Sequence, residues 1–282
     1  MNYKKQEIQE YFNDSIINYD KEWIENNQDD LHHEIFNTDY FIIGSYKAKQ
    51  WMSDEAFNII RFIKEYEDWK TSNVIPQKQE GLFAIGIKVH LGDFYTDKAR
   101  LLADLVEKYA AGEIRLTLRQ NILIPFVKED LLPFFYKELD TMGFAEAGYN
   151  KAVDITACPG TDTCNLGIAS STGIAAELER VLKTEYPQYL ENKDLVIKIS
   201  GCMNACGQHT MANIGFQGMS VRTPDKLVAP ALQVLLGGGN LGNGNGLFAD
   251  KVVKIPSRRG PDALRKILND FESNAQGKTF VE

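Results

Sequence analysis

Four cysteines constrain this chain more than any other feature. Cys158, Cys164, Cys202 and Cys206 are the only cysteines, and all lie within 49 residues as Cys-x5-Cys, a gap of 37 residues, and Cys-x3-Cys. Unrelated core cysteines, the plain alternative, rarely form two tight pairs flanked by glycine. The N-terminal segment is polar and carries no signal-like apolar stretch, so disulfides are not expected. The pattern predicts a metal or cluster site.

The spacing of the pairs favours an iron–sulfur cluster over zinc. Structural zinc sites usually separate paired ligands by two to four residues and often include histidine. The first two cysteines are separated by five residues. A zinc-stabilised binding module is therefore the least favoured hypothesis. Four thiolates are the ligand set of a cubane cluster. Small residues around the cysteines, in Ala157–Gly160 and Gly201–Gly207, leave backbone N–H groups for the cluster sulfides.

Charge and hydropathy exclude several classes of protein. The formal net charge is -8, whereas a nucleic-acid-binding protein needs a basic surface for the phosphates. No apolar run approaches the roughly 18 residues that cross a bilayer, so no membrane partner is expected. With a polar N-terminal segment, a cytoplasmic location is expected.

The first half of the chain predicts a helical extension followed by an α+β unit. Residues 1–79 are polar and aromatic with helical spacing in places, and are interpreted as a helical extension or a linker. Residues 80–150 then repeat a strand and a helix twice, which favours a ferredoxin-like half-domain. The predicted elements are a strand at 83–89, a helix at 97–111 ending at Gly112, a strand at 113–127 and a helix at 131–139 ending near Gly143.

Residues 151–282 predict an α/β domain around the cysteines. Its predicted elements are helices at 173–184 and 261–271 and strands at 195–200, 212–217 and 227–236. The glycine-rich stretch 237–246 has two open interpretations, a backbone cradle for carboxylates or phosphates and a surface connection.

The predicted strand 113–127 has two chemically different faces. Side chains alternate along a strand, so apolar residues are expected in the core and polar ones opposite. The apolar set is Ile114, Leu116 and Leu118, and the polar set is Arg115, Thr117, Arg119 and Asn121. The polar face suits a polyanionic ligand, and a solvated outer face is equally compatible with it.

Together with Thr117–Asn121 and Leu236–Gly238, the cysteine pattern resembles the C-terminal half of the sirohaem-dependent nitrite/sulfite reductase family, over about residues 80–282. The resemblance implies a 4Fe–4S cluster on the four cysteines, with Cys206 shared between the cluster and the sirohaem iron. It implies multi-electron reduction of nitrite to ammonia or sulfite to sulfide, with a ferredoxin or flavoprotein as donor. It also implies that sirohaem carboxylates are held by Arg115, Arg119, Gln120, Asn121 and Asn204 and by the backbone of Gly237, Gly238 and Gly239.

The chain departs from the family in one respect. Complete members contain two related halves, and no second copy of the strand–helix unit precedes residue 80. Three explanations fit this pattern: the chain is a fragment, it is a subunit with a partner, or it is a compact enzyme that forms a homodimer. The Thr-x-Arg-Gln form resembles the family's N-terminal half, where the arginine faces substrate. Arg119 is therefore a catalytic candidate, although the cysteine register favours a sirohaem carboxylate as its ligand. Lys198, just before the second cysteine pair, is a second catalytic candidate, with a surface salt bridge as an equal alternative.

Two functions remain open from the sequence. The first is a nitrite or sulfite reductase, or its catalytic half, with nitrite slightly favoured over sulfite. The alternative is an iron–sulfur electron carrier or subunit that lacks sirohaem and is inactive without a partner half.

Overall fold

The computed structural model describes residues 54–222 and 224–280, with side chains from Phe62 onward. Most of the predicted 1–79 extension therefore lies outside the described residues. The chain divides into two compact units, Met1–Asp68 and Trp69–Glu282. Helix α5, Asp54–Asn73, falls within the predicted extension, and the elements that follow belong to the second unit.

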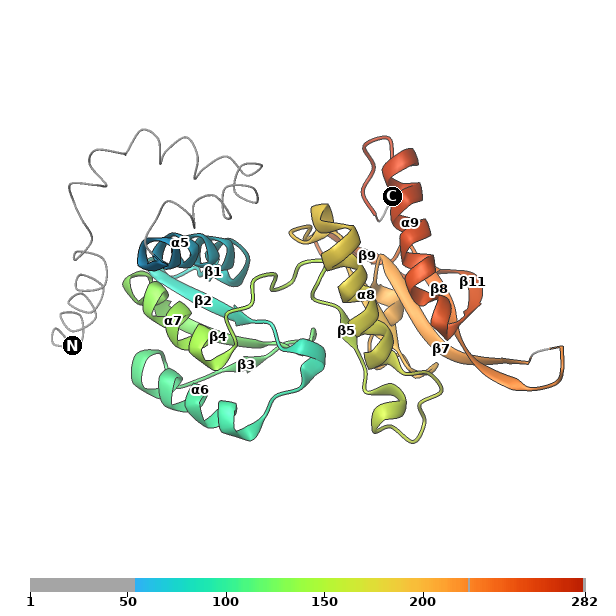
Figure 1. The fold of residues 1–282 in the computed structure, drawn as a ribbon, viewed down its shortest axis with the longest axis horizontal. Coiled ribbons are helices and arrows are strands. Elements are labelled where there is room, and N and C mark those ends of the chain that lie inside the picture. Colours follow the sequence, from blue (N-terminus) through green and yellow to red (C-terminus); the bar gives the residue numbers. More distant parts are fainter. Residues whose placement is uncertain (1–53, 223, 281–282) are drawn as a thin grey trace. The chain divides into compact units, whose positions relative to one another are not determined.

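The first part of the second unit is an antiparallel sheet with helices on one face. The strands run in the order β1-β2-β4-β3, and helices α6 and α7 cover the same face (Figure 1). This confirms the ferredoxin-like half-domain. The elements are β1 Val74–Pro76, β2 Leu82–Ile87, α6 Thr96–Tyr109, β3 Arg115–Leu116, β4 Ile122–Lys128 and α7 Leu132–Met142. As predicted, α7 ends at Gly143, which adopts the left-handed conformation that glycine favours there. Strand β1 lies ahead of residue 80, so the sheet begins before the predicted half-domain does.

The predicted strand 113–127 is wrong in one respect, because a tight turn divides it. The N–H of Thr117 donates to the carbonyl of Asn121 at 2.9 Å, and Gln120 has a positive φ of 65°. The turn divides the predicted strand into two strands, β3 and β4. Side chains before and after the turn therefore do not alternate along one strand. Leu116 and Leu118, predicted in the core, are 81% and 80% exposed, and Ile114 is 43% exposed. Asn121, predicted on the opposite face, is only 1% exposed.

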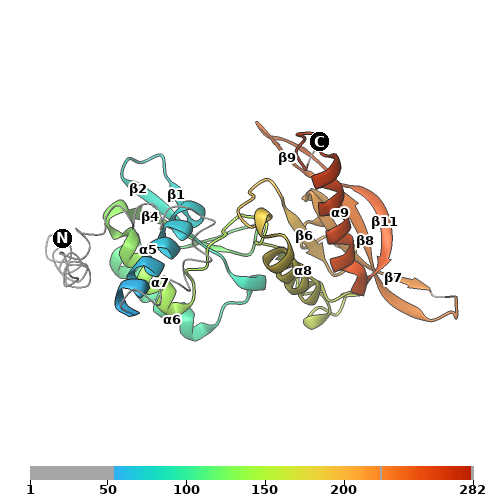
Figure 2. The same ribbon diagram turned by 45° about the horizontal axis from the view of Figure 1, so that its top comes forward.

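The second part is a mixed sheet covered by two helices. The strands run in the order β11-β8-β7-β6-β5, with β5, β6 and β7 parallel and β8 and β11 antiparallel to their neighbours. Helices α8 and α9 pack against each other (Figure 2) and share a core with the sheet, built around Leu178, Leu182, Ile197, Phe216, Leu232 and Leu264. The elements are β5 Thr156–Ala157, α8 Ser171–Glu185, β6 Ile197–Ser200, β7 Ile214–Arg222, β8 Val228–Leu236, β11 Asp250–Pro256 and α9 Gly260–Asn274.

The glycine-rich stretch 237–246 is a hairpin and not an open loop. Strand β9, Gly239–Gly242, pairs with β10, Asn245–Leu247, through a turn at Asn243 and Gly244. Both turn residues have positive φ, 52° and 79°, which a two-residue hairpin requires. Asparagine and glycine tolerate that conformation, so the local sequence specifies the turn.

Across the described residues, every helix is too short or too polar to cross a membrane.

A buried ion pair fastens the half-domain to α8. Lys88 follows β2, and its Nζ lies 2.7 Å from Glu179 on α8 and 3.1 Å from Glu146. Lys183, one turn further along α8, also contacts both carboxylates. Burial raises the pKa of Glu179 and Glu146, but Lys88 and Lys183 outweigh this and hold both values below the usual range. Both carboxylates are therefore ionised at neutral pH.

Replacing Lys88 with methionine is expected to lower the free energy of unfolding by about 3 kcal/mol, because removing one partner leaves a buried carboxylate poorly compensated. Urea titration of the full chain measures this. Lys183→Met is the matched control, since Lys183 is half exposed and its loss is expected to cost less than about 1 kcal/mol. Equal effects of the two substitutions would contradict the structural role of Lys88.

Candidate functional site

The two cysteine loops leave the sheet at the same edge. Strands β5 and β6 are parallel, with Ala157 opposite Ile199. Cys158 follows the last residue of β5, and Cys202 lies just beyond the end of β6 at Ser200. Parallel strands present their carboxyl ends together, so loops separated by 37 residues in the sequence start side by side.

These loops pack against each other through glycine. The N–H of Gly201 donates to the Sγ of Cys158 at 3.1 Å, and the carbonyl of Gly201 accepts from Ile168 and Ala169. A Cβ at Gly201 would stand 2.6 Å from the Cα of Gly160, closer than real side chains come. Only glycine therefore permits this approach, and the first and second cysteine pairs form one structural element.

The thiols are free but differ in exposure. Cys158 and Cys202 are buried, while Cys164 and Cys206 are exposed. Within the part of the chain that the structure describes, no three cysteine, histidine or carboxylate side chains converge as a metal-binding group. The structure thus brings the two loops together, but it does not bring the four sulfur atoms to one point. The residues fit a cubane cluster by their chemistry, four thiols on adjoining loops with a backbone N–H already directed at one sulfur.

The turn between β3 and β4 carries a mostly buried arginine with an unused donor. The Arg119 side chain is 16% exposed, and its Nη1 lies 4.0 Å from Oδ2 of Asp154. Among the described side chains, this Nη1 is one of the few buried polar atoms without a hydrogen-bond partner. Burial lowers the pKa of Arg119, while Asp154 and Tyr149 oppose the shift. A buried N–H without an acceptor is costly, so this atom is suited to an anionic oxygen from outside.

Lys198 is a second mostly buried cation, close enough to Arg119 and Asp154 for their charges to act on it. It belongs to β6, is 8% exposed, and its Nζ donates to Oε1 of Gln208 at 2.6 Å. Burial lowers the pKa of Lys198, Arg119 lowers it further, and Asp154 raises it. The surface salt bridge considered for Lys198 is therefore wrong. We call Arg119, Asp154 and Lys198 the buried charge cluster.

Gln120 and Asn121 connect the arginine turn to the first cysteine loop. Oε1 of Gln120 accepts the N–H of Ala157, next to Cys158, at 3.1 Å. Nδ2 of Asn121 donates to Asp154 at 2.6 Å, and its Oδ1 accepts the N–H of Val89. These polar atoms are engaged inside the protein, so both residues hold the turn in place.

Two other predicted contacts are exposed. Arg115 pairs with Glu113 at 2.9 Å, and its guanidinium lies 5.7 Å from the ring centre of Phe126. Asn204 is exposed in the second cysteine loop. Both remain predictions as sirohaem contacts, and neither joins the buried charge cluster.

The glycines at 237–239 are held at the other edge of the sheet. Leu236 pairs with Ile214, the first residue of β7, whereas the cysteine loops leave from the carboxyl ends of β5 and β6. The N–H of Gly237 donates to Asn213, whose Nδ2 donates to the carbonyl of Gly238. Gly237 and Gly238 thus lie against residues 210–213, the segment that follows the second cysteine loop, and Gly239 opens strand β9 next to them.

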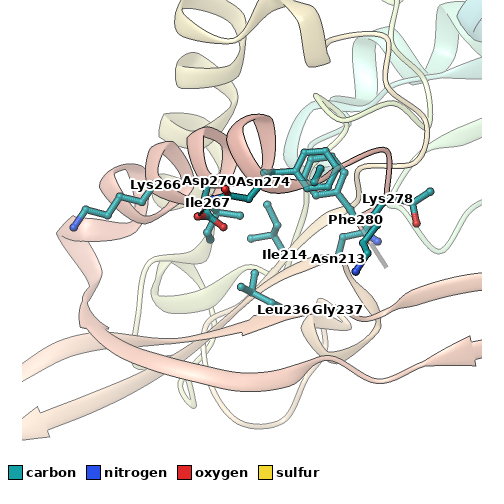
Figure 3. Close-up of a pocket in the computed structure, with 13 residues that line it drawn as sticks. Asn213, Ile214, Leu236, Gly237, Lys266, Ile267, Asp270, Asn274, Lys278 and Phe280 are labelled. Carbon is teal, nitrogen blue, oxygen red and sulfur yellow. Dashed lines mark hydrogen bonds between the residues drawn. The ribbon is translucent and has the colours of Figure 1, made fainter. Parts of the chain in front are cut away.

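A pocket of about 380 Å³ lies at this second edge (Figure 3). Its lining includes Ile214 and Leu236 from the sheet, Lys266 and Asp270 from α9, and Phe280 beyond that helix. No cysteine and no member of the buried charge cluster lines it. The pocket is therefore separate from the site at the cysteine loops.

Asp154 and Gln208 were not identified from the sequence. Asp154 stands alone in the otherwise uncharged run 152–158, and an isolated charge in a buried segment is the signal that marks it. Gln208 offers no comparable signal, because its contact with Lys198 depends on how the second cysteine loop folds back.

Two family profiles match consecutive parts of the chain. One is described as the nitrite/sulfite reductase ferredoxin-like half domain and covers residues 75–142. The other is the nitrite and sulphite reductase 4Fe-4S domain and covers residues 148–279.

Curated relatives and a solved structure agree with these matches. The ferredoxin–nitrite reductase of Synechococcus elongatus is 28% identical over 72% of this chain and 40% of its own length. Sulfite reductase [ferredoxin] 1 of Mycolicibacterium paratuberculosis is 28% identical over 72% of this chain and 37% of its own length. The structure of the Mycobacterium tuberculosis NirA protein superposes with a TM-score of 0.62 at 25% identity, over 74% of this chain and 39% of that one. The chain thus spans 40% or less of the length of each of these three proteins.

Proposed function

The chain belongs to the nitrite/sulfite reductase family, and we propose that it acts as the cluster- and sirohaem-binding part of a reductase for nitrite or sulfite. The observation that carries this proposal is the joining of two cysteine loops at one sheet edge, with a buried cationic cluster linked to the first loop by Gln120 and Asn121. Relatives named for nitrite and for sulfite support both substrates.

Family membership supports a 4Fe–4S cluster and a sirohaem as cofactors. Cys158, Cys164, Cys202 and Cys206 would hold the cluster, and the thiolate of Cys206 would also bind the sirohaem iron. Cys206 is exposed, which leaves its sulfur accessible to a second group. When bound, these cofactors would carry electrons from the donor protein to a small anion at the sirohaem iron.

The remaining residues bind and orient negative charge. The buried Nη1 of Arg119 can donate to an anionic oxygen, either a sirohaem carboxylate or an oxygen of the substrate. Lys198 adds a second cation at a position fixed by Gln208. Preorganised cations in a site shielded from water stabilise charge that develops during reaction, because little reorganisation is needed.

Membership of the nitrite/sulfite reductase family also supports a proposal about partner proteins. The relatives are named as ferredoxin-dependent enzymes, which supports a ferredoxin donor, with a flavoprotein as the other proposal. A chain that spans 40% or less of its relatives is completed, in our proposal, by an N-terminal half, a partner subunit or a second copy. We retain the cytoplasm as the proposed location.

A second function has one observation in its favour. Leu116 and Leu118, at the arginine turn, are apolar and largely exposed, which is the kind of surface that a second half would bury. If that half is required for sirohaem binding, the chain alone is an iron–sulfur electron carrier or subunit without sirohaem.

The visible spectrum of the full chain, purified anaerobically with iron and acid-labile sulfide measured alongside, separates these functions. We expect a Soret band with a red band, and about five irons per chain, the four of a cubane cluster and one of sirohaem. A broad absorbance with about four irons and no Soret band would instead support the carrier or subunit. Absence of labile sulfide would contradict both functions.

A further inference from the structure

Asp154 is the only carboxylate of the buried charge cluster, and nothing above gives it a function. It is 5% exposed, four residues before Cys158. Three contacts reach one of its oxygens, Oδ2: Nδ2 of Asn121 at 2.6 Å, the N–H of Asn150 at 2.9 Å, and Nη1 of Arg119 at 4.0 Å.

The cluster would repel itself without this carboxylate. Arg119 and Lys198 are both mostly buried, and each cation disfavours the charged form of the other. Burial raises the pKa of Asp154 above its ordinary value, and the Asn150 hydrogen bond, Arg119, Asn121 and Lys88 offset only part of that rise. Asp154 in turn favours the charged form of both cations. One carboxylate thus compensates two like charges, and the cluster keeps a net positive charge.

The distance between Asp154 and Arg119 leaves a donor free. At 4.0 Å, Nη1 of Arg119 is attracted by Oδ2 but is too far away to donate to it. The two hydrogen bonds from Asn121 and Asn150 already occupy that oxygen. The guanidinium is therefore held by charge while its buried N–H remains available.

We propose that Asp154 is a positioning residue, the counter-ion that holds the Arg119 guanidinium with Nη1 available for an external anionic oxygen. The proposal deepens the proposed function and rests on the role given there to Arg119. A sirohaem carboxylate and an oxyanion substrate offer the same chemistry to this atom, so the two sources are distinguished by experiment.

Asp154→Asn tests the proposal cleanly. An asparagine Oδ1 can still accept from Asn121 and Asn150, so the substitution removes the charge and retains the hydrogen bonds. It also makes the site more positive. General electrostatic attraction predicts tighter anion binding after this change, whereas loss of positioning predicts weaker binding, so the two explanations differ in sign.

The experiment uses the full chain with its cofactors and has two arms. The first measures the rate of sirohaem loss on dilution, from the Soret band, and the second measures the nitrite dissociation constant by spectral titration. Asp154→Asn and Arg119→Ala are each expected to weaken binding about tenfold in the same arm, the effect of losing one charge-assisted hydrogen bond. Asp140→Asn, which removes an exposed carboxylate on α7, is the matched control and is expected to leave both arms unchanged.

Each outcome decides one question. Asp154→Asn behaving as Asp140→Asn, or binding more tightly, while Arg119→Ala weakens, overturns the positioning role alone. Arg119→Ala without effect in either arm removes Arg119 from the site, which is a failure of the proposed function. Asp154→Glu keeps the carboxylate and is expected to restore most of the affinity. If Asp154→Asn does not fold, an Asp154→Glu chain as weak as Arg119→Ala overturns the counter-ion role.

Discussion

Serine in place of Cys206 is expected to abolish both the sirohaem spectrum and the cluster, and with them the reductase activity. A serine hydroxyl is a far poorer ligand than a thiolate for the irons of a cluster or a sirohaem. If one sulfur serves both irons, a single substitution removes a ligand from each cofactor. The measurement is the Soret absorbance with iron and acid-labile sulfide per chain, and activity is assayed with reduced ferredoxin.

Cys164→Ser provides the comparison, because the proposed function gives Cys164 to the cluster alone. Both cysteines are exposed, so neither substitution disturbs the core. The Cys164 variant is expected to lose cluster iron and sulfide but to retain more sirohaem than the Cys206 variant. A Cys206→Ser chain with its full complement of sirohaem, or equal loss of sirohaem in both variants, would contradict the shared ligand.

The second large effect is expected for Gly201→Ala. The added Cβ would lie 2.6 Å from the Cα of Gly160 and 2.8 Å from the carbonyl oxygen of Ala169. Both neighbours are backbone atoms, which cannot swing aside, so the two cysteine loops must separate. We expect the free energy of unfolding to fall by about 3 kcal/mol and the cluster to be lost. Urea titration and the iron and sulfide content measure these two consequences.

Gly173→Ala is the matched control for this substitution. Gly173 lies in the exposed first turn of α8, and its added Cβ would meet the hydroxyl of Ser170 at 2.8 Å. That hydroxyl caps the helix, so its displacement costs about 1 kcal/mol, while alanine in a helix gains a similar amount over glycine. The net change is expected to be small. A Gly201→Ala chain that retains both its stability and its cluster would show that the loops need no close approach.

The outline of the fold could be predicted because its signals are local. Alternation and helical spacing identified most strands and helices, and Gly143 ended a helix at the predicted residue. The strand 113–127 was mispredicted because alternation continues in the sequence through a turn that reverses the chain. The predicted core face, Leu116 and Leu118, is therefore exposed, and the residues after the turn are buried instead.

The family could be inferred from the sequence, because the spacing of four cysteines and a short arginine motif does not depend on folding. What surrounds these residues depends on tertiary packing. Arg119, Asp154 and Lys198 meet because a turn, a segment before β5 and strand β6 converge, and no local pattern encodes that convergence. The same packing places Gly237 against Asn213, since β8 runs antiparallel to β7 and ends beside its first residue. The spacing of the cysteines along the chain indicates which cofactor chemistry is present. The burial of the side chains and the distances between them determine which groups can act together.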